Sequence, residues 1–336
     1  MLGLPAAAAV AASATPPAGA QTTGDPLPSW NEGQAKRAIL SFVRVATDPA
    51  SPQFVRNEDR IATFDQDGTL WVEHPVYAQV VFALDRVVAL APEHPQWKNV
   101  EPFKTVLSGN QGRIAALSLK DLETILAATH TGMTEEDFQA IAAAWIAKAR
   151  NARWDRPYTG LVYQPMLEAM QYLRLAGFKT YIVTGGGQAF VRAYAAQTYG
   201  VAPEQVIGSA IKTKYAYDKN GRAVLIREPS LLLNNNLSGK AEDIYLFLGR
   251  RPHAAFGNSS GDRQMLEYTQ GNGGARLMML VLHDDAEREY AYGPARGLPD
   301  TKIGTFPQSL YDEALSRSWN VISMKNDWKT LFKAAD

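Results

Sequence analysis

The sequence predicts an α/β fold, a doubly wound and mostly parallel sheet with an inserted helical cap. Short apolar segments alternate along the chain with segments of helical spacing, an order typical of helices that cover both faces of a sheet. The first strand is expected at residues 60–65, which are mostly apolar and end in a carboxylate. The mostly helical stretch that follows, residues 76–151, is too long for a simple crossover and therefore predicts a cap.

The remaining elements follow from the spacing of apolar residues and from turn residues. Asn220 and Gly221 predict the turn of a β-hairpin over residues 212–227, and Gly200 predicts the end of a helix. Helices are expected at residues 35–45, 134–146 and 189–199 and from Lys240 onward, strands at 179–183, 253–256 and 276–282, and a last strand or helix within 319–332.

The composition limits the class of partner. Hydrophobic residues make up 46% and charged residues 20% of the chain, as in an ordinary globular protein. Lys plus Arg and Asp plus Glu both number 34, so no net field favours nucleic acid or an anionic membrane. The body of the chain has no apolar run long enough to span a membrane. A small-molecule partner is therefore expected.

The first residues differ from the rest and predict export. Residues 1–20 are small, apolar and uncharged, and Ala18-Gly19-Ala20 has the form of a signal-peptidase site. We therefore expect a signal peptide at 1–20 and a periplasmic or secreted protein, the alternative being a disordered tail on a cytoplasmic one. A core of residues 21–70 and 160–336 and a cap of residues 71–159 complete the expected division.

Polar residues follow each predicted strand, at the sheet edge where ligands bind in open α/β folds. Because the carboxyl ends of parallel strands share one edge, we expect these side chains to converge. The groups are Asp65 and Asp67 after the first strand, Thr184, Gly185 and Gly186 after the second, Asn258 and Asp262 after residues 253–256, and Lys240 at a helix start.

Each of these groups has a task in phosphoryl transfer. Asp65 and Asp67 lie two residues apart around a turn, so one carboxylate can attack phosphorus while the other acts as general acid and base. Two close carboxylates imply a hard cation between them, for which Mg²⁺ is the natural choice. Thr184 and the amides of the following glycines can bind phosphate oxygens, and Lys240 supplies positive charge for the transition state.

These segments resemble the haloacid dehalogenase-like (HAD) superfamily, and within it the phosphoserine-phosphatase-like branch. The family motif DxDGT stands at residues 65–69, and an apolar strand ends at Thr184. Lys240 matches the family lysine, and the motif GDxxxD corresponds to residues 257–262, which read GNSSGD. The match spans roughly residues 60–282. The resemblance implies a HAD-type Rossmann-like core and hydrolysis of a small phosphomonoester.

The same resemblance implies the roles of individual residues. Asp65 forms an aspartyl-phosphate, Asp67 is the acid and base, and Mg²⁺ is held by Asp65, the backbone carbonyl of Asp67 and the fourth motif, here Asn258 and Asp262. Asn258 departs from the family, since it replaces an aspartate with a neutral amide. Dehalogenases lack an acid at the position of Asp67 and are disfavoured, whereas phosphotransferases share these motifs and stay open.

Substrate choice in this family belongs to the cap and the segment that leads into it. Glu73 is a candidate for binding a substrate ammonium group, as a glutamate does in phosphoserine phosphatases. It lies eight residues after Asp65, however, whereas the family glutamate lies nine after its nucleophile, a position that His74 fills here. Glu73 is equally explained as a solvated cap residue. Two alternatives stay beside the exported phosphatase: an inert phosphate-ester binding protein on the same fold, and a cytoplasmic phosphoserine phosphatase.

Overall fold

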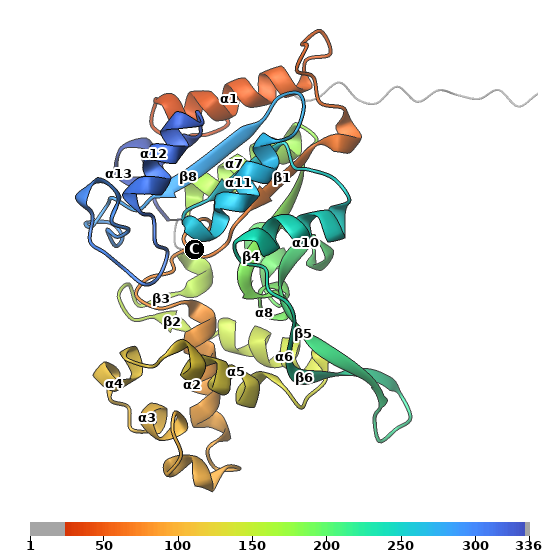
Figure 1. Cartoon of the computed structure of the whole chain (residues 1–336), viewed down its shortest axis with the longest axis vertical. Coiled ribbons are helices and arrows are strands. Elements are labelled where there is room, and N and C mark those ends of the chain that lie inside the picture. Colours follow the sequence, from red (N-terminus) through yellow and green to blue (C-terminus); the bar gives the residue numbers. More distant parts are fainter. Residues whose placement is uncertain (1–23, 333–336) are drawn as a thin grey trace, which may run out of the picture.

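A computed structural model describes residues 24–332, and its centre is a seven-stranded sheet (Figure 1). The predicted signal peptide, residues 1–20, lies outside the described residues. The strand order is β6-β5-β4-β1-β7-β8-β9. The strands are β1 (Ile61–Phe64), β4 (Lys179–Gly187), β5 (Val206–Tyr217), β6 (Ala223–Leu233), β7 (Ala254–Gly257), β8 (Leu277–Leu282) and β9 (Asn320–Ser323).

The sheet is mostly parallel, as predicted. Every neighbouring pair runs parallel except β5 and β6, which form the expected hairpin with Gly221 in a left-handed conformation (φ +76°). From β1 the chain moves to β4 and β5 on one side of the sheet, and after β6 it returns to β7 on the other side. The order therefore reverses at β1, which is where open α/β sheets bind ligands.

Alternate residues of the strands face two different cores, which makes the fold doubly wound. In β8, Met279 and Val281 belong to one apolar cluster, whereas Met278 and Leu280 belong to the other. The first core contains α1 (Gln34–Thr47) and α7 (Gln164–Leu175), and the second contains α10 (Ser238–Leu248), α11 (Arg263–Gln270) and α12 (Gln308–Ser316). The short α13 (Met324–Asp327) follows β9.

The chain between β1 and α7 is mostly helical and lies beyond the carboxyl ends of the strands (Figure 1). Its helices are α2 (Ala78–Leu90), α3 (Phe103–Leu107), α4 (Gln111–Ala115), α5 (Leu119–His130) and α6 (Glu135–Ile146), followed by the short strands β2 (Arg150–Asn151) and β3 (Arg156–Pro157). Trp97, Phe103 and Ile125 form part of a separate apolar cluster within this insertion. The exact division into core and cap residues stays a prediction.

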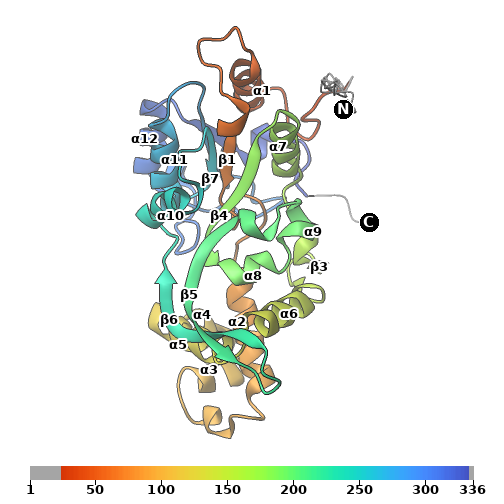
Figure 2. The same ribbon diagram turned by 90° about the vertical axis from the view of Figure 1, so that its right-hand side faces the viewer.

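The β5–β6 hairpin reaches from the sheet down to the inserted helices (Figure 2). Arg227 of β6 is buried against them, and its guanidinium lies 3.9 Å from the ring centroid of Phe138 in α6. The same side chain donates from Nε to the backbone oxygen of His130 at 2.6 Å and pairs with Glu135 at 2.8 Å. The hairpin therefore closes the space between the sheet and the insertion.

The predicted elements are present with one correction. Residues 189–199 were expected to form one helix, but they form α8 (Gln188–Arg192) and α9 (Ala195–Tyr199) with a break at Tyr194 (φ −137°). The break accompanies burial of Tyr194, whose ring stacks on Trp71 and whose hydroxyl accepts a hydrogen bond from Gln66 at 2.9 Å. Of the helices within residues 24–332, none has the length and apolar character that a membrane crossing requires.

Replacing Arg227 tests whether the hairpin is anchored to the insertion. We expect Arg227→Ala to lower the free energy of unfolding by about 2–4 kcal/mol, because the change leaves the His130 carbonyl and Glu135 without their buried partner. The measurement is urea denaturation. Arg222→Ala, at the exposed end of the same hairpin, is the control and should cost less than about 0.5 kcal/mol. Equal losses for the two variants would contradict the anchoring role.

Candidate active site

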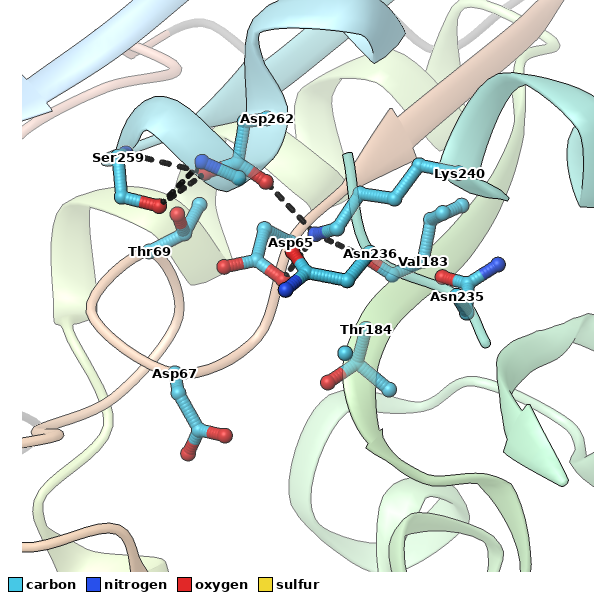
Figure 3. A network of polar contacts seen from close by, with 12 residues as sticks. Asp65, Asp67, Thr69, Val183, Thr184, Asn235, Asn236, Lys240, Ser259 and Asp262 are labelled. Atoms are coloured by element: carbon cyan, nitrogen blue, oxygen red, sulfur yellow. Dashed lines mark hydrogen bonds and ion pairs between the residues drawn. The ribbon is translucent and has the colours of Figure 1, made fainter. Parts of the chain in front are cut away.

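The site is built on the loop that follows the central strand β1. The backbone amide of Asp65 donates to Phe256 of β7 at 2.9 Å, so the sheet ladder continues to the first site residue. The chain then turns through Gly68, which has a left-handed conformation (φ +73°). Asp65 points its carboxylate toward Lys240, whereas Asp67 lies further along the loop (Figure 3). The two acids are therefore neighbours with different surroundings.

Lys240, near the start of α10, carries the positive charge of the site. Its Nζ lies 2.5 Å from Oδ1 of Asp65, 2.6 Å from Oδ1 of Asp262 and 2.8 Å from the backbone oxygen of Val183 (Figure 3). Only 2% of the residue is exposed. Burial by itself would lower the pKa of Lys240, but the charges of Asp262 and Asp65 outweigh burial and raise it. The ammonium group is therefore charged.

One ammonium group faces two buried carboxylates, so the positive charge does not fully offset the effect of burial on the pKa values of the acids. Burial, together with the charge of Asp262, raises the pKa of Asp65 to about 7 despite the opposing effect of Lys240. Burial also raises the pKa of Asp67 to about 6, while a 2.6 Å hydrogen bond from the indole nitrogen of Trp71 acts in the opposite direction. Asp67 is thus a carboxyl group that can hold a proton close to neutral pH.

The glycines after Thr184 leave the regular sheet. The pairing of β4 with β5 shifts register between Thr184 and Gly187, so Gly185 and Gly186 lie in a bulge. The amide of Gly186 donates to the Thr184 hydroxyl at 3.0 Å, and the amide of Gly187 donates to Gln79 at 2.7 Å. The hydroxyl and these amides lie at the carboxyl end of the strand, beside Asp65 and Asp67, where phosphate oxygens are expected.

The turn after β7 is held by Asp262. Its Oδ2 accepts hydrogen bonds from the backbone amides of Asn258 and Ser259, each at 3.0 Å, while its Oδ1 accepts from Lys240. The side chain of Asp262 is completely buried. Asp262 therefore links the turn of residues 257–262 to the lysine.

Glu73 and Asn258 contact each other behind the loop of residues 65–69, here called the catalytic loop. The Asn258 amide donates to Oε1 of Glu73 at 2.7 Å, and its own oxygen accepts from Thr69 at 3.2 Å. The Tyr292 hydroxyl also donates to Glu73, at 2.8 Å. Because Glu73 is only 2% exposed, its interpretation as a solvated cap residue is wrong. Its role in substrate binding stays a prediction.

The residues around Asp65 have the donor chemistry of a magnesium site. The carboxylates of Asp65 and Asp262 line the cavity and offer oxygen ligands, while the amide oxygen of Asn258 lies behind them and accepts from Thr69. Within residues 24–332 no cluster of three or more His, Cys, Asp or Glu side chains is placed to hold a metal. Mg²⁺ needs only one or two carboxylates and keeps several waters, so this set fits a hydrated Mg²⁺.

Sequence reasoning missed three residues that support the loop after β1 or the neighbouring bulge of β4. His283 donates from Nε2 to the backbone oxygen of Gly68 at 2.7 Å, and its Nδ1 lies 3.0 Å from Glu289. Gln79 joins the insertion to the bulge through Gly187, and Trp71 binds Asp67. These residues lie in no motif, and His283 is more than two hundred positions away from the loop, so no local signal identifies it.

A cavity of about 950 Å³ opens over the site. Side chains of α5, α6 and β6 line its opposite side. Asn258 does not line it, because its side chain is buried against Glu73 and Thr69. The other predicted site residues do: Asp65, Asp67, Glu73, Thr184, Gly185, Gly186, Lys240 and Asp262. The tertiary structure therefore brings together all the strand-end groups that the sequence singled out, with Asn258 one layer behind.

Comparison with known proteins identifies a family that matches part of the chain. Residues 60–230 match the family of haloacid dehalogenase-like hydrolases. That segment begins just before β1 and ends within β6, so it includes Asp65, Asp67 and Thr184 but not Lys240 or Asp262. No curated protein matches the sequence.

Several solved structures have a similar fold. A conserved protein of unknown function from Anaerococcus prevotii DSM 20548 is 14% identical with a TM-score of 0.47, over 75% of this chain and 86% of that one. A protein of unknown function from Bordetella pertussis Tohama I is 15% identical with a TM-score of 0.46, over 78% and 97%. A phosphoserine phosphohydrolase-like protein from Francisella tularensis subsp. tularensis SCHU S4 is 15% identical with a TM-score of 0.37, over 67% and 88%.

Gly68 and Gly221 have similar positive φ values, so alanine variants of the two can separate the cost of backbone strain from the cost of crowding. A Cβ on Gly68 would clash with Nδ2 of Asn258 and Oε1 of Glu73, whereas a Cβ on Gly221 (φ +76°) would meet nothing within 4 Å. Both alanine variants therefore incur the left-handed strain of about 1–2 kcal/mol. We expect Gly68→Ala to lose about 1–3 kcal/mol more than Gly221→Ala because it also overpacks the loop. Chemical denaturation measures both, and equal losses would show that the loop is not tightly packed.

Proposed function

The chain belongs to the haloacid dehalogenase-like hydrolases, and on this premise we propose that it hydrolyses a small phosphate monoester through an aspartyl-phosphate on Asp65. The observation that carries the proposal is the unequal environment of two acids on one loop. Asp65 contacts the buried ammonium group of Lys240, whereas Asp67 is held by an indole N–H at the edge of the cavity. A nucleophile must be ionised and a proton donor must be protonated, so the two acids need different surroundings.

The first step transfers the phosphoryl group to the enzyme. A carboxylate oxygen of Asp65 attacks phosphorus, and the bond between phosphorus and the ester oxygen breaks. Asp67 gives its proton to the departing oxygen, so the alcohol leaves in its neutral form. We assign stabilisation of the phosphoryl oxygens to the Thr184 hydroxyl, the Lys240 ammonium group and the backbone of Gly185 and Gly186, all of which line the cavity with Asp65.

The second step regenerates the enzyme. Water attacks the phosphorus of the aspartyl-phosphate, and Asp67, now a carboxylate, takes one proton from that water. The bond between phosphorus and Asp65 breaks, inorganic phosphate leaves, and both acids return to their starting protonation states. A proton donor with a pKa raised to about 6 suits both directions of this transfer near neutral pH.

Mg²⁺ is the proposed cofactor. Asp65, the backbone carbonyl of Asp67, Asn258 and Asp262 are the residues that would hold it, with Asn258 acting through its neutral amide oxygen or through a water where the family has a carboxylate. When bound, the ion supplies positive charge that offsets the negative charge of the phosphate and of the acids. Because one charged ligand is replaced by an amide, the affinity for Mg²⁺ should be lower than in a site with a second aspartate.

Phosphate release from p-nitrophenyl phosphate tests the reaction. We expect hydrolysis with added Mg²⁺, its loss on addition of EDTA, and a loss of at least about 10³-fold in kcat for Asp65→Asn, since the amide cannot attack phosphorus. Asp312→Asn, which removes an exposed carboxylate on α12, is the matched control and should keep full activity. Full activity of Asp65→Asn would rule out the aspartyl-phosphate.

Removing the hydrogen bond from Trp71 to Asp67 should change the pH dependence of the activity. Because this bond stabilises the Asp67 carboxylate, its removal in Trp71→Phe should raise the pKa of Asp67 further. Asp67 must be protonated to act as an acid, so activity falls as pH rises through its pKa. The falling limb of kcat/KM, measured from about pH 5 to pH 9, should therefore move to higher pH.

Trp145→Phe is the control for this shift, since it removes an indole hydrogen bond of 2.8 Å to Asp85 on the exposed surface of the insertion. Its pH profile should match that of the unmodified protein. A falling limb that stays in place in Trp71→Phe would mean that Asp67 is not the titrating acid.

A further inference from the structure

The cavity above the site has apolar side chains in its lining in addition to the polar groups around Asp65. Its volume of about 950 Å³ is at the upper end of the range for pockets that hold drug-sized ligands, so a phosphate group and a short polar alcohol fill only a small part of it. The part of the lining contributed by α5, α6, α8 and β6, called here the apolar end, includes Leu126, Phe138 and Phe190 and, from β6, Leu225, Leu231 and Leu232, beside polar side chains such as Glu123 and Gln139.

The two arginines near the apolar end are already bound to other groups of the protein. Arg227 binds Glu135 and the His130 backbone oxygen, and Arg192 donates to the backbone oxygens of Pro203 at 2.8 Å and Val206 at 3.2 Å. Burial, with Arg227 and Arg86 nearby, lowers the pKa of His130 to about 3, so this imidazole is neutral. Neither arginine is therefore free to bind the carboxylate of an amino-acid phosphate.

The leucines of β6 are exposed in a place where proteins seldom leave them. Leu231 is 56% and Leu232 59% exposed, although β6 is an edge strand of the sheet. An open apolar edge invites association with other chains, which proteins usually prevent with charged residues. Both leucines line the cavity of the site, and this continuity indicates that a bound substrate covers them.

We propose that the apolar end binds the leaving group of the substrate, and that this group is a bulky apolar alcohol. The inference rests on the proposed phosphatase activity, because the same cavity holds the phosphate at Asp65 and the alcohol at β6. Leu126, Phe138 and Leu231 then contact the hydrocarbon part, while the polar groups around Asp65 bind only the phosphate. The cavity thus favours alkyl or aryl phosphates over phosphoserine.

A homologous series of esters tests this preference. We expect kcat/KM to rise from ethyl through butyl and hexyl to octyl phosphate, by up to about fourfold for each methylene that becomes buried and by at least about 100-fold over the series. O-phosphoserine should be no better than ethyl phosphate, because both arginines of the apolar end are engaged and leave its carboxylate without a partner there.

Two exposed leucines provide a matched pair of variants. Leu231→Gln removes an apolar side chain from the cavity and should reduce the ratio of octyl to ethyl phosphate hydrolysis by about tenfold. Leu246→Gln changes a residue of α10 that is 65% exposed and does not line the cavity, so the ratio should stay the same. Since both side chains are exposed, neither change should prevent folding.

The outcomes distinguish the two levels of the proposal. A rise with chain length that Leu231→Gln weakens and Leu246→Gln does not would support the apolar end as the alcohol site. Hydrolysis of p-nitrophenyl phosphate with no rise along the alkyl series, or with phosphoserine preferred, would overturn the apolar site and leave the phosphatase reaction standing. Failure to hydrolyse any of these esters with Mg²⁺ would overturn the phosphatase reaction and, with it, the apolar site.

Discussion

The ammonium group of Lys240 has three oxygen partners within 2.8 Å, and they come from three separate parts of the chain. Asp65 follows β1, Val183 belongs to β4 and Asp262 lies in the turn after β7. A buried lysine is tolerated only when its charge is compensated and its hydrogen bonds are made. The contact therefore requires the three strand ends and the start of α10 to meet at one point, and that requirement fixes the site.

The charge of this lysine does not balance the acids around it. Asp65 and Asp262 share it, and Asp67 and Glu73 are buried close by. Burial raises the pKa of Asp67, and it raises the pKa of Glu73 well above the ordinary value of a glutamate. A site with surplus negative charge has a physical reason to bind a cation, and a carboxyl group with a raised pKa has a reason to carry a proton. Both properties suit phosphoryl transfer.

A layer of side chains behind the loop keeps this arrangement in place. His283 holds the Gly68 carbonyl, and Asn258 joins Glu73 to Thr69. Above the loop, the insertion and the β5–β6 hairpin meet through Arg227 and enclose the cavity. The chemistry thus depends on the strand ends, whereas the shape of the space available to a substrate depends on the hairpin and the inserted helices.

The sequence by itself determined the α/β class, the mostly parallel sheet and the residues that meet at the strand ends, because parallel strands place their carboxyl ends on one edge. It also located Asp65, Asp67, Thr184, Lys240 and Asp262, since each follows a strand or opens a helix. Only the tertiary structure decided that Glu73 is buried against Asn258, that residues 189–199 break at Tyr194, and that His283 supports the loop. These contacts join residues far apart in the chain, where local spacing has no information, and they depend on packing that forms only when all layers are assembled.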